Sequence, residues 1–250
     1  MTDPPATLAE VAAALGAGRH EEAIRLAGSI LGERPGDDAA HELRARALLA
    51  LGRIGEAERD AADAVRLDPD EIRYRELLAE ILSASGAHRD AAGEYARLAR
   101  NDPAQPAWTL AEAGERLDAA DGRGAAEAAR RAVRLDASDP RAQLALARAL
   151  TAAGDAPGAV QAATLAAQLR PGDPLAREAL ADAHWLAGQE AAAFAEFRAL
   201  AAELGGADRA RTIRKARTLY AASTGWWGRL ILAIPGLFGL ALERGWVGVR

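Results

Sequence analysis

The side chains that could perform chemistry are few and scattered. The chain has four histidines, His20, His41, His88 and His184. Their spacing does not match that of a zinc-binding HExxH helix. We interpret them as exposed residues at the starts of helices. Residues 121–124 read Asp-Gly-Arg-Gly, without the spacing or the lysine of a phosphate-binding loop. The chain has no cysteine. We therefore expect no catalytic residue, no metal site and no cofactor.

Charge divides the chain into an acidic body and a basic end. Residues 1–207 carry 34 acidic and 23 basic side chains, whereas residues 208–250 carry 2 acidic and 8 basic ones. An acidic body is poorly suited to nucleic acid, whose phosphates require a basic surface. The first residues lack the basic and apolar regions of a secretory signal. These features favour a cytoplasmic protein that binds protein and no nucleic acid.

Three columns of residues recur every 34 positions. Proline stands at positions 35, 69, 103 and 171, and glycine stands at positions 18, 52, 86, 154 and 188. The third column is unbroken and consists of Ala23, Ala57, Ala91, Ala125, Ala159 and Ala193. Such columns indicate one supersecondary unit that is stacked several times.

Each period has the pattern of two helices. An Asp-Pro pair such as Asp139-Pro140 suits a helix start, because Asp caps the free N–H groups and proline needs no partner at the first helical position. The glycine column ends the first helix and the proline column ends the second. We predict units at 4–37, 38–71, 72–105, 106–139, 140–173 and 174–207, a basic capping helix at 208–222, and a hydrophobic segment at 223–250.

The fourth unit departs from this pattern. Ala120 and Ala137 stand where other units carry glycine and proline, and Gly114 lies inside the first predicted helix. Glycine inside a helix costs roughly 0.5–1 kcal/mol relative to alanine. We expect this unit to be the least stable one.

The columns resemble those of the tetratricopeptide repeat family. The shared features are a small residue at position 8 of each unit, glycine at 15, alanine at 20, an apolar residue at 27 and proline at 32, together with the sequence Leu-Asp-Pro-Asp at 67–70. The resemblance covers residues 4–207. It implies an all-α, right-handed superhelical solenoid of six helix-turn-helix repeats whose first helices line a concave groove.

The resemblance also places particular residues in that groove. The residues that we expect to bind a partner are Glu42, Arg46, Glu76, Glu80, Arg148, Glu178, Asp182 and Trp185. They are mainly acidic, and the lysine/asparagine clamp by which family members hold a terminal carboxylate is missing. The expected partner is therefore a basic or apolar helical segment of a protein. Two alternatives stay open: a merely solvated inner face, and a Trp185 that packs against the capping helix.

The C-terminal segment has features of a membrane contact. Its apolar run, residues 230–242, would span roughly 20 Å as a helix, against about 30 Å for the bilayer core. Tryptophans flank the run and basic residues precede it, as at membrane interfaces. The candidate membrane contacts are Arg209, Arg211, Arg214, Lys215, Arg217, Trp226, Trp227, Leu230, Ile231, Ile234, Leu237, Phe238 and Trp246. The alternatives are docking of this segment on the protein's own repeats and a homo-oligomer interface.

The sequence thus predicts a non-catalytic scaffold or adaptor. It would bind a protein segment in its groove, and its C-terminal segment would tether it to the cytoplasmic face of a membrane. The alternative function is a regulatory or substrate-delivery subunit, or the soluble N-terminal part, of a membrane-bound enzyme or integral membrane protein. Salt separates charge-driven from apolar binding, because only the former weakens as salt rises.

Overall fold

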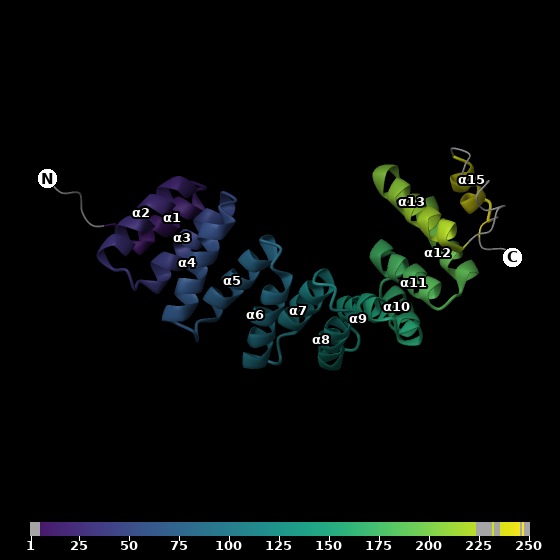
Figure 1. The fold of residues 1–250 in the computed structure, drawn as a ribbon, viewed down its shortest axis with the longest axis horizontal. Helices are drawn as coiled ribbons and strands as arrows, with labels where there is room; N and C mark the ends of the chain where they lie inside the picture. The colour runs from purple at the N-terminus through teal and green to yellow at the C-terminus, as the bar shows by residue number, and fades with distance from the viewer. Residues whose placement is uncertain (1–5, 224–231, 233–235, 246, 248–250) are drawn as a thin grey trace. The chain divides into compact units, whose positions relative to one another are not determined.

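The computed structural model describes residues 6–223, 232, 236–245 and 247, and this part of the chain is helical throughout, with no strand (Figure 1). The chain forms two compact units, Met1–Ala119 and Ala120–Arg250. The helices of unit 1 are α1 (Leu8–Gly16), α2 (His20–Glu33), α3 (Asp38–Ala50), α4 (Ile54–Leu67), α5 (Ile72–Ala84), α6 (His88–Asn101) and α7 (Pro106–Asp118). Those of unit 2 are α8 (Gly122–Leu135), α9 (Pro140–Ala153), α10 (Ala156–Leu169), α11 (Pro174–Leu186), α12 (Glu190–Glu203), α13 (Gly206–Ser223) and α15 (Leu237–Glu243).

Consecutive helices pack against each other within each unit. In unit 1 every helix contacts the next, and α3 also contacts α1 and α5. Unit 2 repeats this pattern from α8 to α13, with a further contact between α9 and α11. The predicted all-α architecture of packed helix pairs is confirmed.

The helices start and end where the sequence pattern places these events. Asp37, Asp139 and Asp173 each accept a backbone N–H at the start of a first helix. The five glycines at positions 18, 52, 86, 154 and 188 all have positive φ, between 71° and 81°. This left-handed conformation suits glycine because it lacks a Cβ. Ala120 takes the same place with φ 59°, which is a strained conformation for alanine.

The interior of both units is built from the alanine column. All six of its residues are fully buried, and the small residues at position 8 are buried to the same extent. Alanine fills little space, so the helices approach closely. Larger apolar side chains then fill the layers between neighbouring pairs, as Leu48, Leu77 and Ile81 do in unit 1.

Unit 2 contains two contacts that the repeat pattern does not predict. Gly122, the first residue of α8, lies against the backbone of Ala152, and a Cβ at position 122 would come within 2.6 Å of the Ala152 carbonyl carbon. At the other end, Phe238 and Leu242 of α15 share an apolar cluster with Phe194 and Phe197 of α12. Helix α15 is therefore part of the fold of unit 2.

Candidate partner-binding face

Three of the four histidines have side-chain hydrogen-bond partners, whereas His20 Nδ1 is buried without one. His41 is only 8% exposed, which corrects the expectation of an exposed residue. Its Nδ1 lies 3.0 Å from Asp60 Oδ1 and its Nε2 lies 3.1 Å from the Pro35 carbonyl oxygen, so both ring nitrogens are hydrogen-bonded inside unit 1. Arg44 donates to both oxygens of Asp60 at 2.6 Å. His41, Asp60 and Asp63 lie close enough together to be considered as ligands of a metal ion. The hydrogen bonds among His41, Asp60 and Arg44 explain this cluster without a metal ion.

A second group of metal-ligand types, His88, Glu115 and Asp118, has the same explanation. His88 Nδ1 lies 2.9 Å from one oxygen of Glu115, and Ser83 donates to the other oxygen at 2.6 Å. These bonds join α5 and α6 to α7. The ligand-type side chains of this group therefore serve to connect neighbouring helix pairs.

The residues predicted for the groove lie on the first helices of the pairs, and all except Trp185 stand at two repeat positions. The fifth position holds Glu42, Glu76 and Glu178, and the ninth holds Arg46, Glu80, Arg148 and Asp182. We call the surface formed by these positions the first-helix face of each unit. Residues five and nine are one helical turn apart, so each pair lies on one side of its helix.

In unit 1 the structure gives these residues different surroundings. Glu42 is buried and accepts a hydrogen bond from Arg46 of the same helix. Glu76 accepts one from the indole Nε1 of Trp108, on α7, at 2.7 Å. Glu80 is exposed, and no hydrogen bond or ion pair joins it to another described residue. The face thus carries a free carboxylate beside an aromatic residue.

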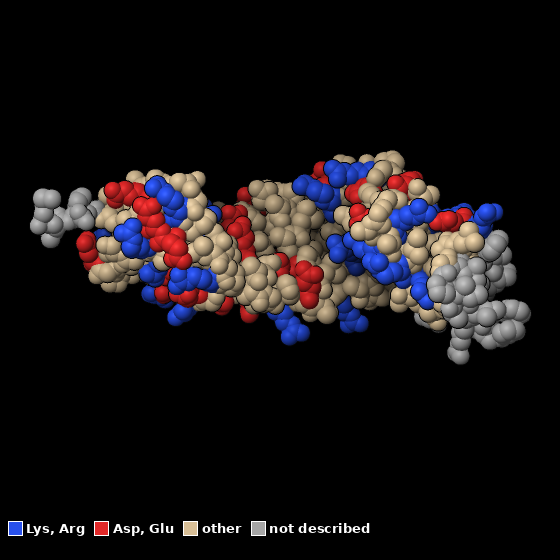
Figure 2. Space-filling model, turned by 90° about the horizontal axis from the view of Figure 1, so that it is seen from above, with Lys and Arg blue, Asp and Glu red and all other residues tan. Residues whose placement is uncertain are grey.

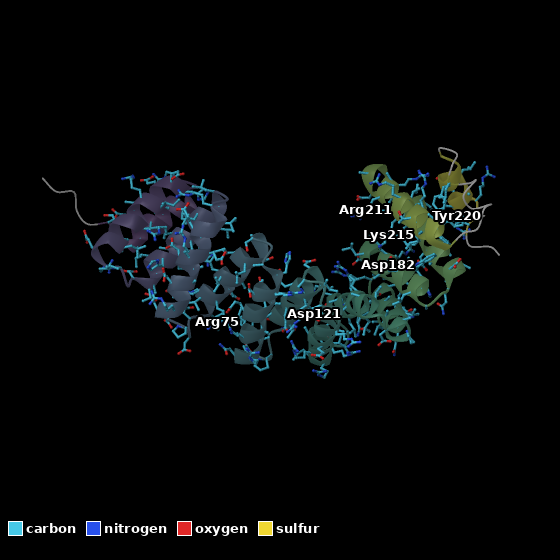
Figure 3. The ribbon with its side chains drawn as sticks, in the orientation of Figure 1. Arg75, Asp121, Asp182, Arg211, Lys215 and Tyr220 are labelled. Carbon is cyan, nitrogen blue, oxygen red and sulfur yellow. The ribbon has the colours of Figure 1, made fainter. Side chains whose placement is uncertain are left out.

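In unit 2 the corresponding residues on α11 meet α13. Lys215 of α13 donates to Glu178 Oε1 and to Asp182 Oδ2, both at 2.7 Å (Figure 3). We call this contact the Lys215 bridge. Two residues that the sequence assigned to a partner and one that it assigned to a membrane are therefore bound to each other. Arg148, by contrast, is exposed.

Burial and charge act in opposite directions on the Lys215 bridge. Burial is the largest influence on the pKa of Asp182 and raises it, although Lys215 acts to lower it. For Lys215, burial is again the largest single influence, and it lowers the pKa. The hydrogen bonds to Asp182 and Glu178 raise the pKa, and together with the charges of these two groups they outweigh burial. The net effect is a raised Lys215 pKa. One ammonium group thus serves two carboxylates.

The remaining basic residues assigned to the membrane have varied positions on α13. Arg209 pairs with Glu243 of α15, and Arg217 donates to the Leu232 carbonyl oxygen at 2.6 Å. Arg211 Nη2 lies 3.8 Å from Asp208 Oδ1, and Arg214 is exposed. Part of the basic cluster thus attaches the C-terminal segment to α13.

The apolar residues of the tail that the structure describes are packed on the protein. Phe238 is 3% exposed and Leu242 is 1% exposed. Edge-on ring contacts run from Trp185 to Phe194 and on to Tyr220, which in turn lies 5.4 Å from Phe238, measured between ring centroids. Within the described residues, no helix has both the length and the apolar character needed to cross a bilayer. Of the other predicted contacts, the side chain of Leu237 and all of Trp226, Trp227, Leu230, Ile231, Ile234 and Trp246 lie outside the described part.

The two units differ in charge. Unit 1 contains 23 acidic and 14 basic residues, whereas unit 2 contains 13 acidic and 17 basic ones. On the face in Figure 2, red acidic side chains form a stripe over the N-terminal helices, and blue basic side chains gather near the grey C-terminal residues. The acidic first-helix residues without a basic neighbour therefore belong to unit 1.

Comparisons with solved structures identify the fold. A tetratricopeptide repeat protein from Parabacteroides merdae is 16% identical, with a TM-score of 0.67 over 93% of this chain and 97% of that one. The C-terminal part of a tetratricopeptide repeat-containing protein from Cytophaga hutchinsonii is 14% identical, with a TM-score of 0.70 over 96% and 93%. The MamA protein is 16% identical, with a TM-score of 0.59 over 68% and 97%.

Sequence comparisons support the same assignment. The search of curated proteins gave no match. Two family models described as tetratricopeptide repeat match residues 14–81 and 110–174, which together make up about half of the chain. The first segment lies in unit 1, and most of the second lies in unit 2. The columns of glycine and alanine, the packed helix pairs and both family models agree, and the chain belongs to the tetratricopeptide repeat family.

Proposed function

We propose that the protein is a non-catalytic scaffold that binds a segment of another protein on its first-helix face. The proposal rests on where two types of residue lie, the alanines in the interior and the charged residues on the first helices. Alanine fills the interior, and the charged residues at positions five and nine of the first helices, apart from the buried Glu42, are at least partly exposed. A stacked array presents such residues as one extended surface, which suits a partner segment rather than a small substrate.

The chemistry of this face favours a basic helical segment. In unit 1 its charged residues are mostly acidic, with Glu42, Glu76 and Glu80 against Arg46. Electrostatic attraction of this kind speeds association and weakens as salt rises.

We further propose that the C-terminal segment caps the last helix pair of unit 2. The buried Phe238 and Leu242 support this docking over the other two alternatives, and the Lys215 bridge supports attachment of α13 to the same helix pair. Contact of residues 222–250 with a membrane stays a prediction, and it concerns the residues outside the described part.

Site-specific photo-crosslinking tests the scaffold proposal. A crosslinking amino acid at the exposed Ala50 or Ala84, in the last turns of α3 and α5, should capture a defined protein from a native extract, which mass spectrometry identifies. The same group at Glu33 or Arg89, exposed on second helices, is the matched control. Capture of one partner only from the second helices would contradict the proposal.

A further inference from the structure

Three first helices carry a glutamate at position five followed by a charged residue at position nine. These pairs are Glu42–Arg46 on α3, Glu76–Glu80 on α5 and Glu178–Asp182 on α11. They are spaced by whole multiples of 34 residues, so the repeat places them equivalently on their helices. What differs among them is the source of positive charge.

Two of the pairs meet a basic side chain within the protein. On α3 the cation is Arg46 itself, which donates to Glu42. On α11 both members are acidic, and the cation comes from another helix, because Lys215 of α13 binds Glu178 and Asp182 at 2.7 Å each. The structure therefore shows directly which ligand an acidic pair at these repeat positions holds: the ammonium group of a lysine that projects from a helix.

The pair on α5 has no such cation. Among the described residues, neither Lys nor Arg forms an ion pair with Glu76 or Glu80. Glu76 accepts only the neutral Trp108 indole N–H, which leaves further lone pairs of its carboxylate available. Like charges one turn apart on a helix repel each other. The α5 pair thus carries an unfavourable interaction that a bound cation would relieve.

The surroundings of this pair are electronegative and aromatic. Burial, followed by the charges of Glu80, Glu115 and Glu76, raises the pKa of Tyr95 to about 12. Trp108 is bonded to Glu76 at the same place.

We propose that Glu76 and Glu80 bind the ammonium group of a lysine on a helical segment of the protein partner. The contact would reproduce the Lys215 bridge, with the lysine supplied by another molecule. This inference rests on the proposed scaffold function and specifies its site and its partner chemistry. The site belongs to unit 1 alone and needs nothing from unit 2.

Fluorescence anisotropy with the full chain tests the inference. The probe is a labelled amphipathic helical peptide with a leucine stripe and two lysines four residues apart, and the comparison peptide carries glutamines in place of the lysines. The lysine peptide should bind about tenfold more tightly, as expected for loss of a charge-assisted contact. The double variant Glu76→Gln/Glu80→Gln should abolish this preference, while glutamine at 76 can still accept the Trp108 N–H.

The matched control is Glu33→Gln/Asp90→Asn, which removes the same charge from exposed sites in unit 1 and should keep the preference. Three results would overturn the inference: equal binding of both peptides, an equal loss in the control variant, or no binding of either peptide. Equal binding that maps to the first-helix face would still uphold the scaffold function. The crosslinking experiment decides that function separately.

Discussion

Helices α5 and α11 carry acidic pairs at the same two repeat positions, but only α11 has a partner within the chain. There Lys215 of α13 binds both carboxylates, whereas on α5 Glu80 stays exposed and Glu76 bonds to an uncharged indole. The repeat therefore determines where the acidic side chains lie on their helices. The helix that packs against them determines whether their carboxylates find a cation within the chain. A terminal helix pair acquires a cap, and an internal one keeps a surface that another molecule can use.

The largest expected effect tests whether the cap on unit 2 is real. Phe238→Ala removes a ring that is 3% exposed and should destabilise α12, α13 and α15 by about 3 kcal/mol, since truncation of a buried Phe leaves a cavity. Hydrogen exchange of the α12 amides measures this change. Leu240→Ala is the control, because Leu240 is 43% exposed. Unchanged exchange together with weaker binding to anionic vesicles would instead support the membrane interpretation.

A smaller effect is expected for the bridge itself. Lys215→Met leaves two carboxylates without their cation and should cost about 1–2 kcal/mol in unit 2, less than a fully buried charged contact because a third of the Lys215 side chain is exposed. Unit 1 should not respond. Local hydrogen exchange at α11 and α13 distinguishes the two units.

The same contact predicts a dependence on pH. The pKa of Lys215 in the folded protein is raised above its ordinary 10.5, so the stabilisation is complete below pH 10.5 and is lost as pH rises through the folded pKa. The stability difference between the parent and Lys215→Met should therefore be constant from pH 7 to about pH 10 and shrink above it. A difference that persists at higher pH would show that packing, and not charge, is lost in the variant.

The smallest pair of effects compares two helix ends. Ala120→Gly should stabilise the protein by about 0.5–1 kcal/mol, since it removes left-handed strain at φ 59° but adds freedom to the unfolded chain. Gly154→Ala, at φ 81°, should destabilise by about 1 kcal/mol for the opposite reason. Thermal unfolding measures both shifts. Equal signs for the two variants would contradict the assignment of Ala120 to the glycine column.

The sequence predicts the repeating part of the fold well, because local rules determine it. Glycine at a fixed spacing ended five first helices, and the alanine column marked the helix contacts. The sequence does not predict contacts that depend on a break in the pattern. Lys215 follows Glu178 and Asp182 by 37 and 33 residues and lies just beyond the last regular unit. Because Lys215 belongs to no repeat column, the column pattern does not predict its contact with the two carboxylates.

Two further residues show the same limit. His41 was expected at the surface, but Asp60 lies 19 positions away in the sequence and makes burial of its ring favourable. Gly122 was considered only as part of a phosphate loop, and its role is to let α8 approach Ala152. Each of these contacts joins two helices, and a pattern within one helix carries no information on it.

Local hydrogen exchange of two double variants tests the comparison between α5 and α11 most directly. Glu178→Gln/Asp182→Asn should lower the stability of α11 and α13 by about 1–2 kcal/mol, because Lys215 loses its charged partners. Glu76→Gln/Glu80→Gln should leave α5 unchanged or stabilise it by up to about 0.5 kcal/mol, because a repulsion is removed. A loss of stability at α5 equal to that at α11 would contradict the account, since it would mean that Glu76 and Glu80 already have a cationic partner within the chain.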